Sequence, residues 1–172
     1  SAYRVWLSST ILDPRYYSLR NNGSSVRLVK DAQIVNLSTL TGDYEAQNGD
    51  ILINTLAGNY KITIADGATV TLRNATINGT NDNSYQWAGI TCLGDVTISL
   101  SGTNTVKGFN GDYPGIQAAH NDTGVGDEYT LTIQGTGSLT ASSNGWGAGI
   151  GGGWGINCGN IVINGGSSIE AT

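Results

Sequence analysis

The chain has 172 residues, of which only 12% are charged and 26 are glycine, and its formal net charge is -5. Ser, Thr, Asn and Gln must therefore supply most of the polar surface, a profile typical of extracellular β-proteins. Five of the eight cations precede residue 43, and from residue 74 onward Lys107 is the one Lys or Arg beside seven carboxylates. A nucleic-acid surface needs clustered cations, so that class of protein is excluded. No apolar run approaches the length of a membrane span, and we expect no membrane insertion.

The first 31 residues do not share the pattern of the rest. Residues 3–7 and 25–29 alternate like two strands, and a polar segment joins them. Residues 2–9 and 23–31 resemble the carboxyl-terminal end of the Fibrobacter major paralogous domain family, which is C-type-lectin-like and occurs in surface proteins of gut and rumen bacteria. The resemblance implies that residues 1–42 contain the remnant of an upstream domain. The alternative is that these strands only cap the repeats that follow, because an open repeat end needs a cap.

Residues 43–172 carry a repeat. Its apolar anchors Leu72, Leu100, Ile133 and Ile163 lie 28, 33 and 30 residues apart, a period typical of solenoids. Each copy alternates Val, Ile or Leu with Thr in short runs that end at Gly, Asn or Asp, which indicates strands and not helices. We therefore predict an all-β fold, a right-handed single-stranded parallel β-helix (solenoid) over residues 43–172, with a short non-repetitive N-terminal cap over residues 1–42.

A second resemblance covers this repeat region. Residues 62–72, 87–92 and 141–153 resemble the β-helical repeats known as carbohydrate-binding domains in surface proteins of Bacteroidetes and clostridia. The resemblance implies a glycan-binding or adhesion module whose partner is a polysaccharide or surface glycan. The chain begins with Ser and contains no Met, so we expect a piece of a longer secreted or cell-surface bacterial protein. Because residues 169–172 stop within a repeat, we also expect an edge open to edge-to-edge self-association.

Aromatic residues precede the Gly-Ile pair in three copies of the repeat. Stacked copies should bring these rings to one corner, where they would pack on the apolar faces of sugar rings while nearby Asn, Asp and Gln bond the hydroxyls. The alternative is a buried aromatic stack in a purely structural spacer or stalk. The predicted glycan-binding residues are Trp87, Tyr113 and Trp146, flanked by Tyr85, Asp82 and Trp154.

Catalysis is not expected. The single His, His120, has no cationic neighbour in the sequence, and no paired carboxylates, nucleophile with a base, or metal-spaced His and Cys cluster stands out. We therefore predict no enzyme, no cofactor and no metal. The loop carboxylates, Asp82, Asp112, Asp122, Asp127 and Glu128, are interpreted as solvated charges, with calcium binding as the alternative.

Two smaller patterns complete the sequence. For Cys92 and Cys158 we expect two buried free thiols and no disulfide, because their strands should lie too far apart to bridge. Outward Thr residues predict a hydroxyl ladder of the kind used by some ice-binding β-helices, although Thr is also an ordinary strand residue. The ladder would comprise Thr69, Thr71, Thr97, Ser99, Thr130 and Thr132.

Overall fold

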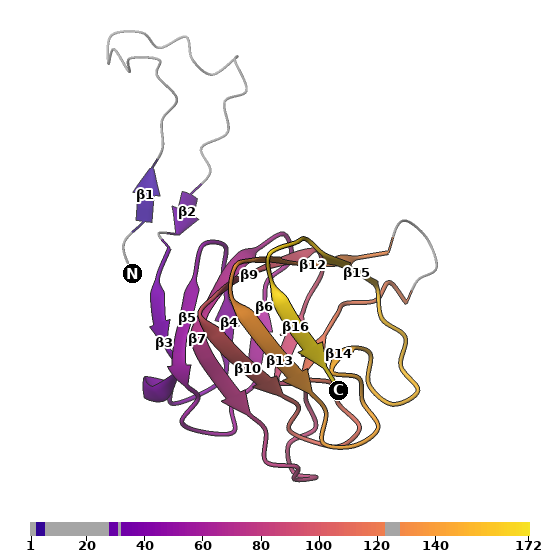
Figure 1. Cartoon of the computed structure of the whole chain (residues 1–172). Coiled ribbons are helices and arrows are strands. Elements are labelled where there is room, and N and C mark those ends of the chain that lie inside the picture. Colours follow the sequence, from indigo (N-terminus) through magenta and orange to yellow (C-terminus); the bar gives the residue numbers. More distant parts are fainter. Residues whose placement is uncertain (1–2, 6–27, 31, 123–127) are drawn as a thin grey trace, which may run out of the picture. The chain divides into compact units, whose positions relative to one another are not determined.

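The computed structural model describes residues 3–5, 28–30, 32–122 and 128–172 (Figure 1). The chain divides into two compact units, Ser1–Asp31 and Ala32–Thr172, and each is described by itself. In the first unit, β1 (Tyr3–Val5) pairs antiparallel with β2 (Leu28–Lys30). Most residues that carry the resemblance to the lectin-like family lie outside the described residues.

Two sheets of parallel strands make up the second unit (Figure 1). The nine-stranded sheet contains β3 (Ile34–Asn36), β5 (Ile51–Thr55), β7 (Thr69–Asn78), β9 (Val96–Ser101), β10 (Thr103–Lys107), β12 (Thr130–Gly135), β13 (Ser138–Ser142), β15 (Asn160–Ile163) and β16 (Ser168–Ala171). The five-stranded sheet contains β4 (Tyr44–Ala46), β6 (Ile62–Ile64), β8 (Ile90–Cys92), β11 (Ile116–Gln117) and β14 (Ile150–Gly151). A short 3-10 helix, η2 (Leu37–Thr39), follows β3. The predicted parallel strands are confirmed.

The apolar core is built from alternate residues of these strands. In β9 every second side chain is buried, and in β6 both Ile62 and Ile64 are fully buried while Thr63 between them is not. A strand that alternates in this way buries one face and leaves the other to water. Each fully buried Ile or Leu stabilises the fold by about 1.5–3 kcal/mol relative to its exposed state.

The predicted fold class is wrong. The right-handed single-stranded parallel β-helix with an N-terminal cap requires short strands that turn at corners and stack as separate faces of a solenoid. The strands instead lie in two sheets ordered across the unit, and the order of the larger one runs β15-β12-β9-β7-β10-β13-β16. Asn74 (φ 52°) bends β7 without ending it, so this ten-residue strand pairs with β9 along its first half and with β10 along its second. The larger sheet therefore curls around β7.

The strand registers confirm part of the repeat alignment and correct part of it. Leu72 pairs with Leu100, and Ile133 pairs with Ile163, as the anchors predict. Ile133 also pairs with Ile98, however, so the predicted match of Ile133 to Leu100 is wrong by two residues. A slip of two leaves every side chain on the same face of the sheet, which is why the apolar pattern alone does not reveal it.

Asn and Asp side chains tie neighbouring strands together where the chain turns. In each case a side-chain oxygen accepts the backbone N–H at the equivalent turn of the next parallel strand, which satisfies a donor that the sheet ladder leaves free. The pairs are Asp43 with Lys61 (2.8 Å), Asn48 with Thr69 (2.9 Å), Asp66 with Asp95 (2.8 Å), Asn74 with Thr103 (3.0 Å) and Asp95 with Thr130 (2.8 Å).

Asn104 makes the most extensive of these polar connections. Its side chain is 1% exposed, and its Oδ1 accepts the N–H of Ala75 at 2.9 Å. Its Nδ2 donates to the carbonyls of Ser101 at 3.2 Å and Ser138 at 3.1 Å. One buried amide thus bonds to β7, β9 and β13, and both its donor and its acceptor functions are used.

The outer strands at the carboxyl-terminal side are exposed. On one face of β15, Ile161 and Ile163 are 38% and 53% exposed, although their partners Leu131 and Ile133 in β12 are buried. This face has the composition of a core without a covering layer. The edge-to-edge self-association expected there stays a prediction.

The two cysteines differ in burial. Cys92 is buried in β8 and Cys158 is exposed, and both are free thiols. The expectation that both thiols are buried is wrong for Cys158, which is exposed. Burial raises the pKa of the Cys92 thiol to about 12, because the thiolate is disfavoured away from water.

We predict that Asn104→Ala lowers the free energy of unfolding by about 1–3 kcal/mol, because the buried N–H of Ala75 loses its acceptor. Urea unfolding followed by circular dichroism measures the change. Asn160→Ala, at an exposed position of β15, serves as the control and should stay within about 0.5 kcal/mol of the wild type. Equal effects of the two substitutions would contradict the role assigned to Asn104.

We predict that a thiol reagent at pH 8 labels Cys158 alone in the folded chain and labels Cys92 only after unfolding. Since the thiolate is the reactive species, the raised pKa and the burial of Cys92 both suppress its reaction. Mass spectrometry of the labelled chain, with and without guanidinium, gives the result. Labelling of Cys92 in the folded chain, or no labelling of either thiol after unfolding, would be incompatible with this structure.

Candidate functional site

The loops that form the candidate site meet at one edge of the sheets. Because β7, β10 and β13 are parallel neighbours, their carboxyl ends lie together. The loops that leave these ends, residues 79–89, 108–115 and 143–149, therefore lie side by side. The loop between β14 and β15, residues 152–159, adds to them. Loops that extend beyond the strands of a repeat protein often form its binding face.

A four-residue turn, Asn110-Gly111-Asp112-Tyr113, forms the centre of the site. Asn110 is 6% exposed, and its Oδ1 accepts the N–H of Asp112 at 2.9 Å. Its Nδ2 donates to Oδ1 of Asn83 at 2.9 Å, and its carbonyl accepts the N–H of Tyr113 at 3.1 Å. The side chain of Asn110 therefore closes its own turn and links it to the preceding loop.

The carbonyls of the same turn hold two exposed tryptophans. The N–H of Trp146 donates to the carbonyl of Gly111 at 2.6 Å, and the N–H of Trp154 donates to the carbonyl of Asp112 at 2.8 Å. The side chains of Trp146 and Trp154 are 79% and 66% exposed. Two large aromatic rings on separate loops are thus anchored to consecutive residues while their faces remain open to water.

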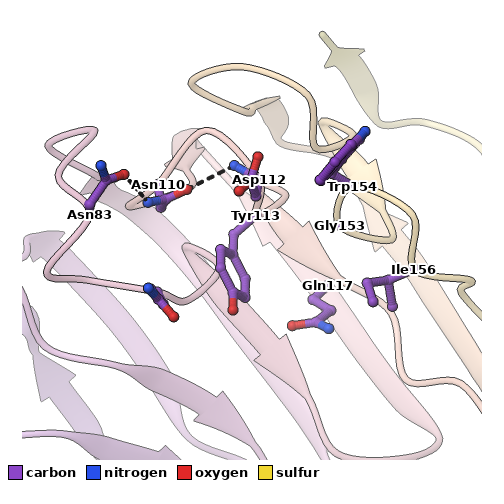
Figure 2. Close-up of a pocket in the computed structure, with 9 residues that line it drawn as sticks. Asn83, Asn110, Asp112, Tyr113, Gln117, Gly153, Trp154 and Ile156 are labelled. Carbon is purple, nitrogen blue, oxygen red and sulfur yellow. Dashed lines mark hydrogen bonds between the residues drawn. The ribbon is translucent and has the colours of Figure 1, made fainter.

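A pocket of about 470 Å³ opens beside this turn (Figure 2). Figure 2 shows Asn83, Asn110 and Asp112 joined by hydrogen bonds, with the Tyr113 ring below them and Trp154 beyond Asp112. Aromatic, amide and aliphatic side chains dominate the lining, and Asp112 is the one charged side chain among the described residues that form it. The lining consists of Asn83, Gln86, Asn110, Asp112, Tyr113, Gln117, Gly153, Trp154 and Ile156.

Two of the predicted aromatic residues point inward instead. Tyr85 and Trp87 pack against the core, with ring centroids 5.3 Å apart, and Phe109 lies 5.9 Å from Trp87 and 6.4 Å from Tyr85. Nε1 of Trp87 is buried and has no hydrogen-bond partner in the described part of the chain. Leaving this buried N–H unpaired costs about 1–3 kcal/mol of stability. The packing of the ring, and not a hydrogen bond of its N–H, therefore stabilises the position of Trp87. The cluster packs residues of the first two site loops against each other.

The predicted row of six residues is thus divided. Tyr113 and Trp154 line the pocket, Trp146 is exposed outside the lining, and Asp82 is exposed on the first loop. The N–H of Ser84 donates to Oδ1 of Asp82 at 2.8 Å, and this bond lowers the pKa of the Asp82 carboxyl. Sequence reasoning expects amides near the rings but does not identify Asn83, Gln86, Asn110 or Gln117, because only the turn geometry selects them.

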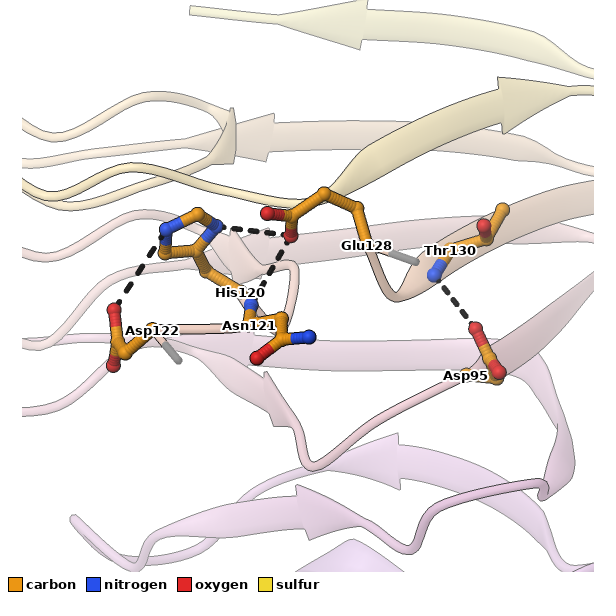
Figure 3. A network of polar contacts seen from close by, with 6 residues as sticks. All are labelled: Asp95, His120, Asn121, Asp122, Glu128 and Thr130. Atoms are coloured by element: carbon orange, nitrogen blue, oxygen red, sulfur yellow. Dashed lines mark hydrogen bonds and ion pairs between the residues drawn. The ribbon is translucent and has the colours of Figure 1, made fainter. Parts of the chain in front are cut away.

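His120 belongs to a separate polar network (Figure 3). Its Nδ1 lies 3.0 Å from Oε2 of Glu128, and its Nε2 lies 3.7 Å from Oδ1 of Asp122. The N–H of Asn121 donates to the same Glu128 oxygen at 3.1 Å. These contacts join the two described ends of one loop, and none of the four residues lines the pocket. Asp127, which sequence reasoning groups with the loop carboxylates, lies outside the described residues.

The hydroxyl ladder is interrupted. Thr97 pairs with Thr69 on one side but with Thr132, and not Thr130, on the other. Ser99 pairs with Gln134, so the second column of hydroxyls ends there. The Thr-x-Thr units are therefore not paired in the register that the sequence predicts, and ice binding stays a prediction.

Within the described residues, no group of three or more His, Cys, Asp or Glu side chains is arranged to hold a metal ion. In the same part of the chain, no helix is long and apolar enough to cross a membrane. Comparisons of the chain with protein-family models, with curated proteins and with solved structures found no match. The function is therefore inferred from the site alone.

We predict effects of different size on the free energy of unfolding for the inward and the outward tryptophan. Trp87→Ala should lower the free energy of unfolding by about 2–4 kcal/mol, because it leaves a cavity beside Tyr85 and Phe109. Trp154→Ala removes an exposed ring and should change the free energy of unfolding by less than about 0.5 kcal/mol. Urea unfolding of both variants measures the difference. A Trp154 variant as unstable as the Trp87 variant would show that Trp154 is a packing residue.

Proposed function

We propose that this chain is a non-catalytic carbohydrate-binding or adhesion module of a secreted or cell-surface bacterial protein. The observation that carries the proposal is the pocket in which Tyr113 and the exposed Trp154 adjoin several amide side chains. Aromatic faces pack on the C–H faces of sugar rings, and amides both donate to and accept from hydroxyl groups.

Exposure and preorganisation favour a binding role for Trp154. Burying apolar ring surface contributes about 25 cal/mol per Å². A ligand that covers the Trp154 ring therefore gains binding free energy from this burial. The backbone bond from Trp154 to Asp112 and the bonds of Asn110 hold the loops before the ligand arrives. Less conformational entropy is then lost on binding. The pocket volume of about 470 Å³ falls within the range of small-ligand sites.

The lining also favours binding without hydrolysis. Glycosidases use two carboxyl groups on either side of the scissile bond. Among the described lining residues, Asp112 is the one carboxylate, and His120 lies in another network. The platform proposed here is accordingly Tyr113 and Trp154, with Trp146 adjoining. Tyr85 and Trp87 pack against the core and are not part of this platform.

The competing proposal is a structural spacer. The packed cluster of Tyr85, Trp87 and Phe109 supports it, because these rings cover a loop corner and offer no open face. The two proposals differ in one observable, since a spacer leaves the exposed Trp154 without a ligand.

We predict that the wild-type chain binds members of an array of plant, host and microbial glycans or pulls down with an insoluble polysaccharide. Trp154→Ala and Tyr113→Ala should each weaken binding at least about tenfold in Kd, which is 1.4 kcal/mol. Tyr129→Ala, which removes a 36% exposed ring outside the pocket lining, serves as the matched control and should retain binding.

Circular dichroism must show that each variant is folded. No binding by folded wild type across the array would favour the spacer. Binding that survives both pocket substitutions would place the glycan elsewhere on the chain.

A further inference from the structure

The charge around the pocket is one-sided. The site loops, residues 79–89, 108–115 and 143–159, contain Asp82 and Asp112 but no Lys or Arg. Beyond residue 73, Lys107 is the one Lys or Arg in the chain, and it does not line the pocket. The lining offers amide groups and two aromatic rings, with a single negative charge at Asp112.

Acidic sugars need partners that this site lacks. Uronate carboxylates and sulfate esters are bound through charge-assisted bonds from Arg, Lys or clustered backbone N–H groups. An anion that enters a pocket without such a partner loses hydration and regains little. The Asp112 carboxylate adds direct repulsion at short range. Neutral sugars meet neither cost, because their hydroxyl groups match the amides of Asn83, Gln86 and Gln117.

We infer that the pocket selects uncharged glycans and that the Asp112 side chain is the residue that determines this selectivity. The inference rests on the proposed carbohydrate-binding function. Two backbone hydrogen bonds hold Asp112 in place. Its N–H donates to Oδ1 of Asn110, and its carbonyl accepts the N–H of Trp154. Asp112 is exposed and belongs to the pocket lining, and its carboxylate makes no hydrogen bond or ion pair within the described residues, so the charge can be removed without disturbing the bonds that shape the turn.

The test compares neutral and acidic ligands on the wild type, on Asp112→Asn and on the matched control Asp82→Asn. Asp82 carries the same charge on a neighbouring loop outside the lining, and Asn at that position can still accept the N–H of Ser84. The probes are the strongest neutral array ligand and polygalacturonate oligosaccharides, titrated by calorimetry at low and at physiological salt.

For the wild type, the acidic probe should bind at least about tenfold more weakly than the neutral probe, and the gap should narrow as salt screens the repulsion. Asp112→Asn should improve binding of the acidic probe about threefold or more, which raises the affinity for the acidic probe relative to the neutral probe. Asp82→Asn should leave the ratio of the Kd values for the acidic and the neutral probe unchanged. Equal or tighter binding of the acidic probe by the wild type would overturn the inference while leaving carbohydrate binding intact.

If Asp112→Asn leaves the ratio of the two Kd values unchanged, Asp112 does not determine the selectivity for uncharged glycans. A relative gain that comes only from weaker binding of the neutral probe would also overturn the assignment to Asp112, because Asp112 would then act as a sugar contact and not by repulsion. Failure of every saccharide to bind folded wild type is a different result, and it would remove the proposed function itself.

Discussion

The parallel register between successive strands is the constraint on which the rest of the structure depends. Backbone hydrogen bonds between the strands maintain this register, and side-chain hydrogen bonds between strands reinforce it. The buried side chain of Asn104 bonds to three other strands. Once β7, β10 and β13 are fixed side by side, the loops that follow them are brought to one edge. The site is therefore a consequence of strand pairing and not of any one loop. A substitution that loosens the register should disturb the pocket before it exposes the core.

The loops use that placement in two ways. Tyr85, Trp87 and Phe109 pack inward and supply apolar support, whereas Trp146 and Trp154 are held outward by the carbonyls of Gly111 and Asp112. Asn110 makes the second arrangement rigid, because its buried amide closes the turn from within. Rigid loops with open aromatic faces suit a ligand that is bound by many weak contacts. The same rigidity explains how glycine-rich loops can present large rings at defined positions.

Much of the fold follows from the sequence, but its assembly does not. Alternation of apolar residues with Thr predicts the strands, their parallel pairing and the buried faces, including Ile62, Ile98 and Ile133. The fold class was wrong because Asn74 bends β7 where a corner was expected, and a left-handed backbone at one Asn cannot be deduced from periodicity. The two-residue shift at Ile133 keeps each side chain on the same face of the sheet, so periodicity does not reveal it. In the site, Trp87 and Tyr113 occupy equivalent positions before a Gly-Ile pair, so the sequence predicts the same role for both. Trp87 nevertheless packs inward and Tyr113 lines the pocket, because the local turn geometry decides where each ring points.

The most direct test of this account is a crystal structure of the chain with the strongest neutral array ligand bound. The account predicts a sugar ring packed on Trp154 and Tyr113, hydroxyl groups bonded to the amides of the lining, and an Asn110–Tyr113 turn unchanged on binding. A glycan seated on the sheet face or on Trp146 alone, with the pocket empty, would contradict it.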